Sequence, residues 1–362
     1  MNKHAITSAV LLGAFGVGFL GCMLYPDQEW SMGERRRLAQ KPVPTMETVM
    51  NTKFMSAFET YSLDQFPLRE QFRNLKANIH YHVFRQKDNN GIYMVDGSLS
   101  KMESGLSEKG VQGAVDKLNA LQEKYFADSK VYFGVIPDKN YHMAEAKGYP
   151  HLEYEKLDEI LSDGLTDMEQ IDLWDVLTIE DYYKTDSHWS QDKIVKVAET
   201  VAEKLGVTVT PLEGYEKNTF DAFHGVYWGQ SALDLPAEEL TYLTSDLLDG
   251  CTVHHFETGK DTGVYQPEKL EGRDPYDVFL GGADALLTIT NPNAKTDREL
   301  ILFRDSFGSS LAPLLVQDYA SVTLVDLRYI ASGILDQFIE FHGQDVLFLY
   351  SPSVYNNSAM LK

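Results

Sequence analysis

The chain has 362 residues, 43% hydrophobic and 24% charged, which is enough to bury a sizeable core in one large domain or two. Its formal net charge of −22 is spread along the chain, which argues against binding nucleic acid through a basic surface. Of the two cysteines, Cys22 lies in an N-terminal apolar segment, so Cys251 has no partner for an internal disulfide elsewhere in the chain.

Residues 5–24 form an uncharged apolar run that follows Lys3. A helix of that length spans about 30 Å, which is the thickness of the hydrocarbon core of a membrane. We therefore predict a membrane anchor over residues 1–24, with a cleaved signal peptide or a lipoprotein site at Cys22 as the alternatives. Residues 25–45 are rich in proline, arginine and polar side chains and are predicted to form a juxtamembrane linker.

Two helices are predicted after the linker, because apolar residues recur at helical spacing. The first carries an aromatic face: Phe54, Phe58 and Tyr61. The second carries a longer apolar face: Leu68, Phe72, Leu75, Ile79 and Val83. We expect the aromatic side chains of both helices to pack in a core.

Residues 89–101 have the pattern of a β-hairpin, because Asp96-Gly97 separates two short apolar segments. Ser107 is predicted to begin a helix, and residues 130–136 are predicted to form a strand that ends at Pro137. Open α/β sheets bind ligands at the carboxyl ends of their strands. Lys139 and Tyr141, just beyond this strand, are therefore substrate-binding candidates, with a solvated turn as the alternative.

A helix near residues 154–161 and a short strand near 170–173 lead into the polar loop YYKTDSHWSQ. This loop places Asp186 and His188 two residues apart, and Ser190 is expected to cap the following helix. That helix is predicted through Leu205, with Gly206 after its end. A histidine in such a polar loop is better placed for chemistry than one buried on an apolar face.

The pattern loosens over residues 211–275, which we interpret as an insertion able to roof the cleft. Apolar alternation returns as predicted strands at 276–280 and 285–290. Gly281 and Gly282 lie between these two strands. They either supply an N–H group to an oxyanion or form a tight turn.

Residues 300–303 are predicted to form a buried strand, and a helix is predicted to follow through Leu315. In that helix Pro313 is expected only in the first turn. Ser306 would then lie on a strand-to-helix turn, with its hydroxyl at the carboxyl edge of the sheet. The alternative is that Asp305 and Ser306 only cap the helix.

The chain ends with a predicted strand at 322–325, a helix at 330–341 and a strand at 346–350. This strand–helix alternation predicts a mostly parallel sheet with helices on both faces. Asp186, His188 and Ser306 supply the carboxylate, imidazole and hydroxyl of a catalytic triad, each just outside regular structure.

The D-x-H-W motif at 186–189, followed far downstream by a strand and D-S-F, resembles the DHHW family of SGNH-hydrolase-like bacterial proteins, which is related to the alginate O-acetyltransferase group. Further blocks of the resemblance follow in order: ERRRLAQKP (34–42), DQFPLRE (64–70), NNGIYMVDGSL (89–99), VIPDK (135–139), YDVFLGG (276–282) and VDLRYI (325–330). Two residues depart from the pattern. Ser187 replaces the first histidine of the family name, and Arg304 stands where the first SGNH block usually has glycine.

The resemblance implies an SGNH-hydrolase-like three-layer sandwich over residues 46–362, preceded by a transmembrane helix and located outside the cell membrane. It implies an O-acetyltransferase for a cell-surface or secreted polysaccharide, with no cofactor and no metal. The acyl donor would come from a multi-pass membrane-bound O-acyltransferase.

In that scheme Ser306 forms an acyl-enzyme, His188 is the general base and Asp186 orients it. Gly281, Gly282, Lys139, Tyr141 and Arg304 are the oxyanion or substrate candidates. A carbohydrate O-acetyl esterase and a non-catalytic glycan-binding or scaffold protein remain the alternatives.

Overall fold

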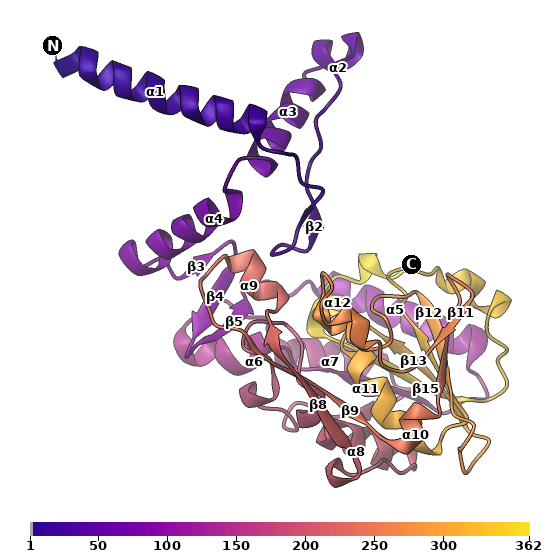
Figure 1. Cartoon of the computed structure of the whole chain (residues 1–362). Helices are drawn as coiled ribbons and strands as arrows, with labels where there is room; N and C mark the ends of the chain where they lie inside the picture. The colour runs from indigo at the N-terminus through magenta and orange to yellow at the C-terminus, as the bar shows by residue number, and fades with distance from the viewer. Residues whose placement is uncertain (1–2) are drawn as a thin grey trace. The chain divides into compact units, whose positions relative to one another are not determined.

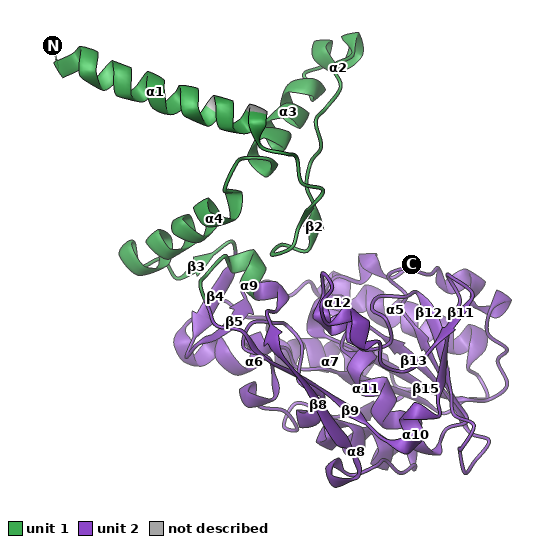
Figure 2. Ribbon diagram, viewed as in Figure 1, with its two compact units in different colours: residues 1–90, 228–234 green, residues 91–227, 235–362 purple. Residues whose placement is uncertain are grey.

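The computed structural model describes residues 3–362, and the chain divides into two compact units (Figures 1 and 2). Unit 1 comprises residues 1–90 and 228–234, and unit 2 comprises residues 91–227 and 235–362. The central sheet lies in unit 2, which begins at Gly91. Residues 46–90, which the sequence analysis places in the α/β domain, group instead with the N-terminal residues.

Unit 1 is mostly helical and begins with the apolar helix α1, Lys3–Leu24. In the part of the chain that the structure describes, Lys3–Cys22 is the one helical stretch long and apolar enough to cross a membrane. The remaining elements of unit 1 are β1 (Trp30–Ser31), β2 (Arg36–Arg37), α2 (Met46–Met50), α3 (Lys53–Asp64), α4 (Arg69–Asn78), a π-helical turn (Ile79–Val83) and β3 (Asp88–Asn89).

The predicted helices after the linker form, but their apolar faces are not in a core. Phe58 is 43% exposed, Phe72 is 52% exposed and Leu75 is 54% exposed. The reason is that α4 packs through its opposite side, where Ala77 is fully buried. On that side the Asn74 amide also donates a hydrogen bond to the Ala232 carbonyl within unit 1.

Unit 2 is built on an eight-stranded sheet in the order β11-β10-β12-β14-β13-β15-β6-β7. Strands β14, β13, β15, β6 and β7 run parallel, whereas β12, β10 and β11 pair antiparallel at one edge. The bounds are β6 Val131–Val135, β7 Glu169–Ile171, β10 Thr252–His255, β11 Lys260–Thr262, β12 Leu286–Thr290, β13 Glu299–Arg304, β14 Ser321–Val325 and β15 Asp345–Tyr350. The predicted mostly parallel sheet is confirmed.

Helices cover both faces of this sheet. Successive strand residues point to opposite sides, and both sets of side chains are apolar, so each face needs a covering layer. Leu302 and Leu347 pack with α8 (Val195–Leu205) and α11 (Gly308–Leu315) on one face. Phe303 and Phe348 pack on the other face, with α5 (Glu108–Tyr125), α7 (Tyr154–Gly164) and α12 (Pro352–Asn356). The result is the three-layer α/β sandwich that the sequence predicts.

Smaller elements complete unit 2. The predicted hairpin forms as β4 (Ile92–Val95) and β5 (Ser98–Lys101), with positive φ at both Asp96 and Gly97. The other elements are α6 (Lys139–Met143), β8 (Glu216–Phe223), α9 (Val226–Ser231, which runs into unit 1), β9 (Glu238–Thr244) and α10 (Asp246–Asp249). Residues 211–275 are therefore not one irregular insertion: β8 and β9 pair with each other, and β10 and β11 extend the central sheet.

Two predicted elements in the C-terminal half are wrong. Residues 275–278 form a 3₁₀ helix instead of a strand, because Pro275 occupies its first turn and the Asp274 side chain accepts the Tyr276 N–H. Residues 330–341 contain only a 3₁₀ helix, Ser332–Gln337. Gly333 in this segment and the loose apolar spacing do not sustain an α-helix.

Two helix ends also differ from prediction. Ser190 precedes a 3₁₀ turn at residues 191–193 and makes no side-chain cap hydrogen bond, and the N-cap of α8 is Ile194. Gly206 ends α8 with a positive φ of 65°, as expected. Pro313 lies in the second turn of α11 rather than in its first. The helix tolerates it because α11 ends at Leu315, so only the bond to the Ser309 carbonyl is lost.

The start of α11 lies so close to β13 that only glycine fits at 308. A Cβ added at Gly308 would lie 2.6 Å from the Cβ of Arg304. We therefore expect Gly308→Ala to lower the free energy of unfolding by about 1–3 kcal/mol, measured by urea denaturation of the full chain in mild detergent. The matched control is the exposed Gly333, where an added Cβ meets nothing within 4 Å. Equal stability of the two variants would contradict the close approach.

Candidate active site

Ser306 lies on the turn between β13 and α11, at the carboxyl end of a central parallel strand. Asp305 fixes this turn: its carboxylate accepts the Phe307 N–H at 3.0 Å and the Ser351 N–H at 2.9 Å. Asp305 therefore fixes the turn before the helix, and α11, whose N-cap residue is Phe307, has no side-chain cap hydrogen bond. The Ser306 hydroxyl is partly exposed and takes no part in capping.

The D-x-H-W loop is held in a narrow bend. Tyr182 and Trp189 pair as an antiparallel bridge, and the Tyr183 N–H donates to the His188 carbonyl at 3.0 Å. Asp186, at the tip of the bend, has no exposed surface. One of its carboxylate oxygens accepts the His188 backbone N–H at 3.0 Å, and the other accepts the Val226 N–H at 2.7 Å. The bend thus places a buried, well-paired carboxylate beside the imidazole.

The structure brings the three predicted side chains into one hydrogen-bonded chain. Asp186 Oδ1 lies 2.6 Å from His188 Nδ1, and His188 Nε2 lies 2.7 Å from Ser306 Oγ. A carboxylate can only accept, so Nδ1 carries the proton and donates it to Asp186. In a neutral imidazole this leaves Nε2 free to accept the serine hydroxyl, which is the tautomer that a general base needs.

Aromatic rings hold the imidazole in this orientation. The ring of Tyr276 stacks on His188 with centroids 4.0 Å apart and an interplanar angle of 10°, and Phe307 meets the imidazole edge-on at 5.0 Å. The Ser310 hydroxyl in turn fixes the Tyr276 hydroxyl at 2.7 Å and the Trp189 indole N–H at 2.8 Å. Burial raises the pKa of Tyr276 well above its ordinary value, so the phenol stays neutral.

Lys139 supports the loop rather than facing a substrate. It is 2% exposed, and its ammonium donates to the carbonyls of Tyr183, Lys184 and Asp186 at 2.7, 3.1 and 3.1 Å. Burial lowers the pKa of Lys139 to about 7, against the opposing charges of Glu238 and Asp186. Its contribution to the site is therefore to hold the backbone that carries Asp186.

Tyr141 lies in an aromatic cluster, with its ring 4.8 Å from Trp174 and 5.1 Å from Tyr154. Its backbone N–H donates to the Asp138 carboxylate at 2.9 Å. None of these contacts involves His188 or Ser306, so the geometry gives Tyr141 a packing role next to the end of β6.

Gly281 and Gly282 form a tight turn, with φ of 79° and 107°. The Gly282 N–H already donates to the Phe279 carbonyl at 3.3 Å. Within residues 3–362 the N–H groups of Gly281 and Ser306 donate no hydrogen bond, so both remain candidate oxyanion donors.

Arg304 is only 1% exposed and lies directly under the turn. Its Nη1 lies 3.8 Å from the Asp326 carboxylate, while Nε and Nη2 have no hydrogen-bond partner. Burial lowers the pKa of this guanidinium, against the attraction of Asp326. The side chain replaces the usual glycine without reaching the outer surface of the site.

The site also includes three residues that the sequence did not single out: Tyr276, Ser310 and Val226. Tyr276 lies in a recognised block, yet nothing in its spacing points to a ring 88 positions away along the chain. Val226 acts through its backbone N–H, which leaves no signal in the side-chain pattern.

The chain is similar to three solved structures. A DHHW family protein from Eubacterium siraeum matches at 20% identity and a TM-score of 0.64, over 75% of this chain and 94% of that chain. Bacillus cereus PatB1, solved with a sulfonyl adduct, matches at 20% identity and a TM-score of 0.59, over 75% of this chain and 99% of that chain. The O-acetyltransferase domain of Pseudomonas putida AlgJ matches at 11% identity and a TM-score of 0.43, over 74% of this chain and 92% of that chain.

A scan against protein-family models and a search of curated proteins gave no match. The first two structures share the fold of this chain, so the resemblance expected from the motifs is confirmed at the level of the fold.

The support that Lys139 gives to the loop can be tested by Lys139→Met. This change removes the ammonium donor from the buried Tyr183 and Asp186 carbonyls, whereas the Lys184 carbonyl keeps the Leu99 N–H at 2.7 Å. We therefore expect the free energy of unfolding to fall by about 2–4 kcal/mol in urea denaturation. The matched control is Lys193→Met, since Lys193 is exposed and its ammonium makes no hydrogen bond or ion pair with residues 3–362. A Lys139→Met variant as stable as this control would contradict the role of the ammonium.

Proposed function

We propose that this protein is an O-acyltransferase that moves an acetyl group onto a polysaccharide hydroxyl through an acyl-enzyme on Ser306. The observation that carries the proposal is the hydrogen-bonded chain from Asp186 through His188 to Ser306. It joins a buried carboxylate, an imidazole in the required tautomer and a partly exposed hydroxyl at the carboxyl edge of a sheet.

In the first step Ser306 Oγ attacks the carbonyl carbon of the acyl donor, and its proton passes to His188 Nε2. The buried Asp186 carboxylate stabilises the imidazolium. The Ser306 N–H and the Gly281 N–H are the candidate donors to the developing oxyanion. Collapse of the tetrahedral intermediate releases the donor alcohol or thiol, which leaves with the proton from His188.

In the second step a sugar hydroxyl replaces the leaving group. His188 Nε2 takes the hydroxyl proton while the oxygen attacks the acyl ester of Ser306. The intermediate expels Ser306 Oγ, which regains its proton from His188. The acetyl group ends on the sugar, and the enzyme returns to its starting state.

The acetyl group and the polysaccharide are proposed from the motif resemblance. PatB1, which shares the fold, carries a sulfonyl adduct, and we propose that Ser306 accepts such electrophiles here. Helix α1 supports a single-pass membrane anchor by its length and apolar composition. The location of the globular part outside the cell membrane is proposed from the motif resemblance. At that position a multi-pass membrane-bound O-acyltransferase would supply the acyl donor.

A carbohydrate O-acetyl esterase is the second candidate, because the His188 side chain is 12% exposed and Ser306 is partly exposed, so water can reach the acyl ester. The full chain in mild detergent is incubated with p-nitrophenyl acetate, with and without neutral and uronic oligosaccharides. We expect acetylated oligosaccharide with the wild type and loss of both nitrophenol release and transfer with Ser306→Ala. The exposed Ser104→Ala is the control.

Release of acetate to water alone would establish the esterase. Equal rates in the wild type and Ser306→Ala would contradict both candidates and leave a non-catalytic glycan-binding or scaffold protein.

Asp186→Asn tests the orienting carboxylate. An asparagine in this buried position no longer favours the Nδ1–H tautomer of His188, so we expect kcat to fall by about 10³–10⁴-fold, measured with p-nitrophenyl acetate. The control is Asp221→Asn at an exposed carboxylate, for which wild-type kcat is expected. A fall of less than about tenfold would show that Asp186 does not orient the base.

A further inference from the structure

Exposed large apolar side chains gather in one part of the chain. Among the described residues after α1, 16 lie between Tyr25 and Phe84, whereas only 4 lie in the remaining residues up to Met360. The surface of a soluble protein rarely exposes so many apolar side chains in one segment, so we infer that residues 25–84 contact another molecule or a membrane.

The apolar side chains of α4 and the π-helical turn after it form a single stripe: Leu68, Phe72, Leu75, Ile79 and Val83, each between 36% and 67% exposed. A cationic stripe runs beside it, formed by Arg69, Arg73 and Lys76 at positions i, i+4 and i+7. A helix with an apolar face next to a basic face is typical of segments that lie in a membrane interface.

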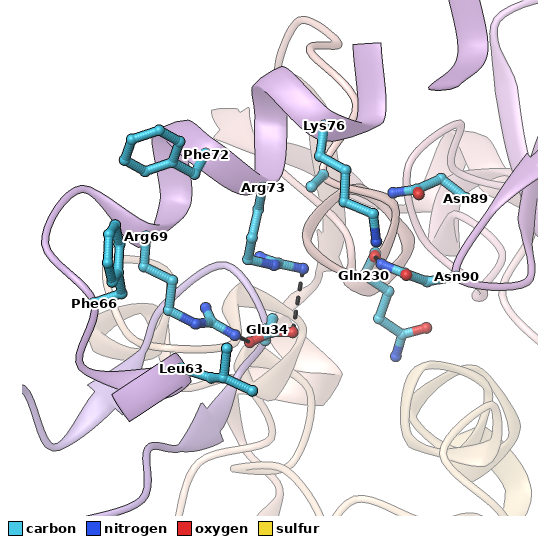
Figure 3. Close-up of a pocket in the computed structure, with 11 residues that line it drawn as sticks. Glu34, Leu63, Phe66, Arg69, Phe72, Arg73, Lys76, Asn89, Asn90 and Gln230 are labelled. Carbon is cyan, nitrogen blue, oxygen red and sulfur yellow. Dashed lines mark hydrogen bonds and ion pairs between the residues drawn. The ribbon is translucent and has the colours of Figure 1, made fainter. Parts of the chain in front are cut away.

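The same two chemistries line a pocket of about 580 Å³ within unit 1 (Figure 3). Phe66 and Phe72 lie at one end of it, and Lys76, Asn90 and Gln230 lie at the other. The pocket is therefore amphipathic, which matches a lipid at the boundary between acyl chain and headgroup.

The cations differ in how they are held. Arg73 lies 3.2 Å from Glu34 and 2.8 Å from Glu70, and Arg69 also pairs with both carboxylates. Within residues 3–362 Lys76 makes no ion pair, so its ammonium is available to an outside anion. The arginine network fixes the shape of the surface, and Lys76 is its free charge.

Charge divides unevenly between the units. Unit 1 has 11 basic and 9 acidic residues, whereas unit 2 has 21 basic and 45 acidic residues. Unit 2 would be repelled by an anionic membrane surface, and unit 1 would not. Unit 1, which contains the apolar helix α1, therefore has a charge compatible with an anionic membrane surface.

We propose that α4 and the following π-helical turn dock in the interface of a membrane that contains anionic phospholipids. The apolar stripe enters the boundary of the acyl chains, and Lys76, flanked by Arg69 and Arg73, faces the headgroup phosphates. With α1 in the bilayer, the 43 residues between Leu24 and Leu68 tether the stripe at high effective concentration near the surface. This docking does not depend on the proposed acyl transfer.

The test places a fluorophore on α4 in the full chain, reconstituted at one protein per lipid nanodisc. Single-cysteine variants Phe72→Cys and Val83→Cys label the stripe, and Gln71→Cys labels an exposed position beside it. Cys22→Ala removes the exposed native thiol, and the buried Cys251 stays. Equal thermal midpoints by circular dichroism verify that each variant is folded.

In discs of phosphatidylcholine and phosphatidylglycerol with brominated acyl chains, we expect labels at 72 and 83 to be quenched at least twice as strongly as the label at 71. Replacing phosphatidylglycerol by phosphatidylcholine should reduce this quenching. Lys76→Gln should lower the docked-to-free ratio about fivefold, since one basic residue near such a surface contributes about 1 kcal/mol.

Three outcomes would overturn the proposal. One is equal quenching at positions 71, 72 and 83. Another is quenching at position 72 that stays the same when phosphatidylglycerol is replaced by phosphatidylcholine and when Lys76 is changed to glutamine. The third is shielding of the 72 label only when two proteins share a disc, seen as energy transfer between labelled copies without bromine quenching, because the stripe would then bind a second copy of the chain.

Discussion

The site depends on one buried carboxylate. Asp186 has no exposed surface, and a charged group in that environment is tolerated only when its oxygens are paired. Two backbone N–H groups and the His188 ring provide these partners. The same requirement that keeps the carboxylate stable therefore sets the tautomer and the direction of the imidazole.

The backbone around Asp186 is shaped to meet that requirement. An added Cβ at Gly225 would lie 2.3 Å from the Asp186 Cβ, so only glycine lets the 225–226 turn approach closely enough for Val226 to donate. The Lys139 ammonium also donates hydrogen bonds to three backbone carbonyls of the same loop. The loop is thus fixed by groups that take no part in the proposed chemistry.

Ser306 reaches the imidazole from a different part of the chain. Parallel strands bring their carboxyl ends to one edge of the sheet, and Asp305 ties the end of β13 to Ser351 at the end of β15. The hydroxyl and the imidazole meet although they lie 118 positions apart in the chain. A rigid sheet edge, rather than a local motif, sets their distance.

Local pattern was enough to predict much of this arrangement. Apolar periodicity predicted β6, β13, β15 and α5, and the polar loop before α8 marked His188 as unusual. Local pattern failed at residues 276–280, where apolar alternation predicted a strand. There the Asp274 cap and Pro275 start a 3₁₀ helix instead. It also failed where function lies in tertiary contacts: helical spacing predicted α4, but spacing cannot tell whether Phe72 packs in a core or stays exposed.

The central claim is that His188 activates Ser306 as a nucleophile. The most direct measurement is the rate of modification by phenylmethanesulfonyl fluoride, with the adduct located by peptide mass spectrometry. The account predicts one adduct, on Ser306, and a rate that falls by about 10²–10⁴-fold in His188→Gln. An adduct on another residue, or an unchanged rate in His188→Gln, would contradict it.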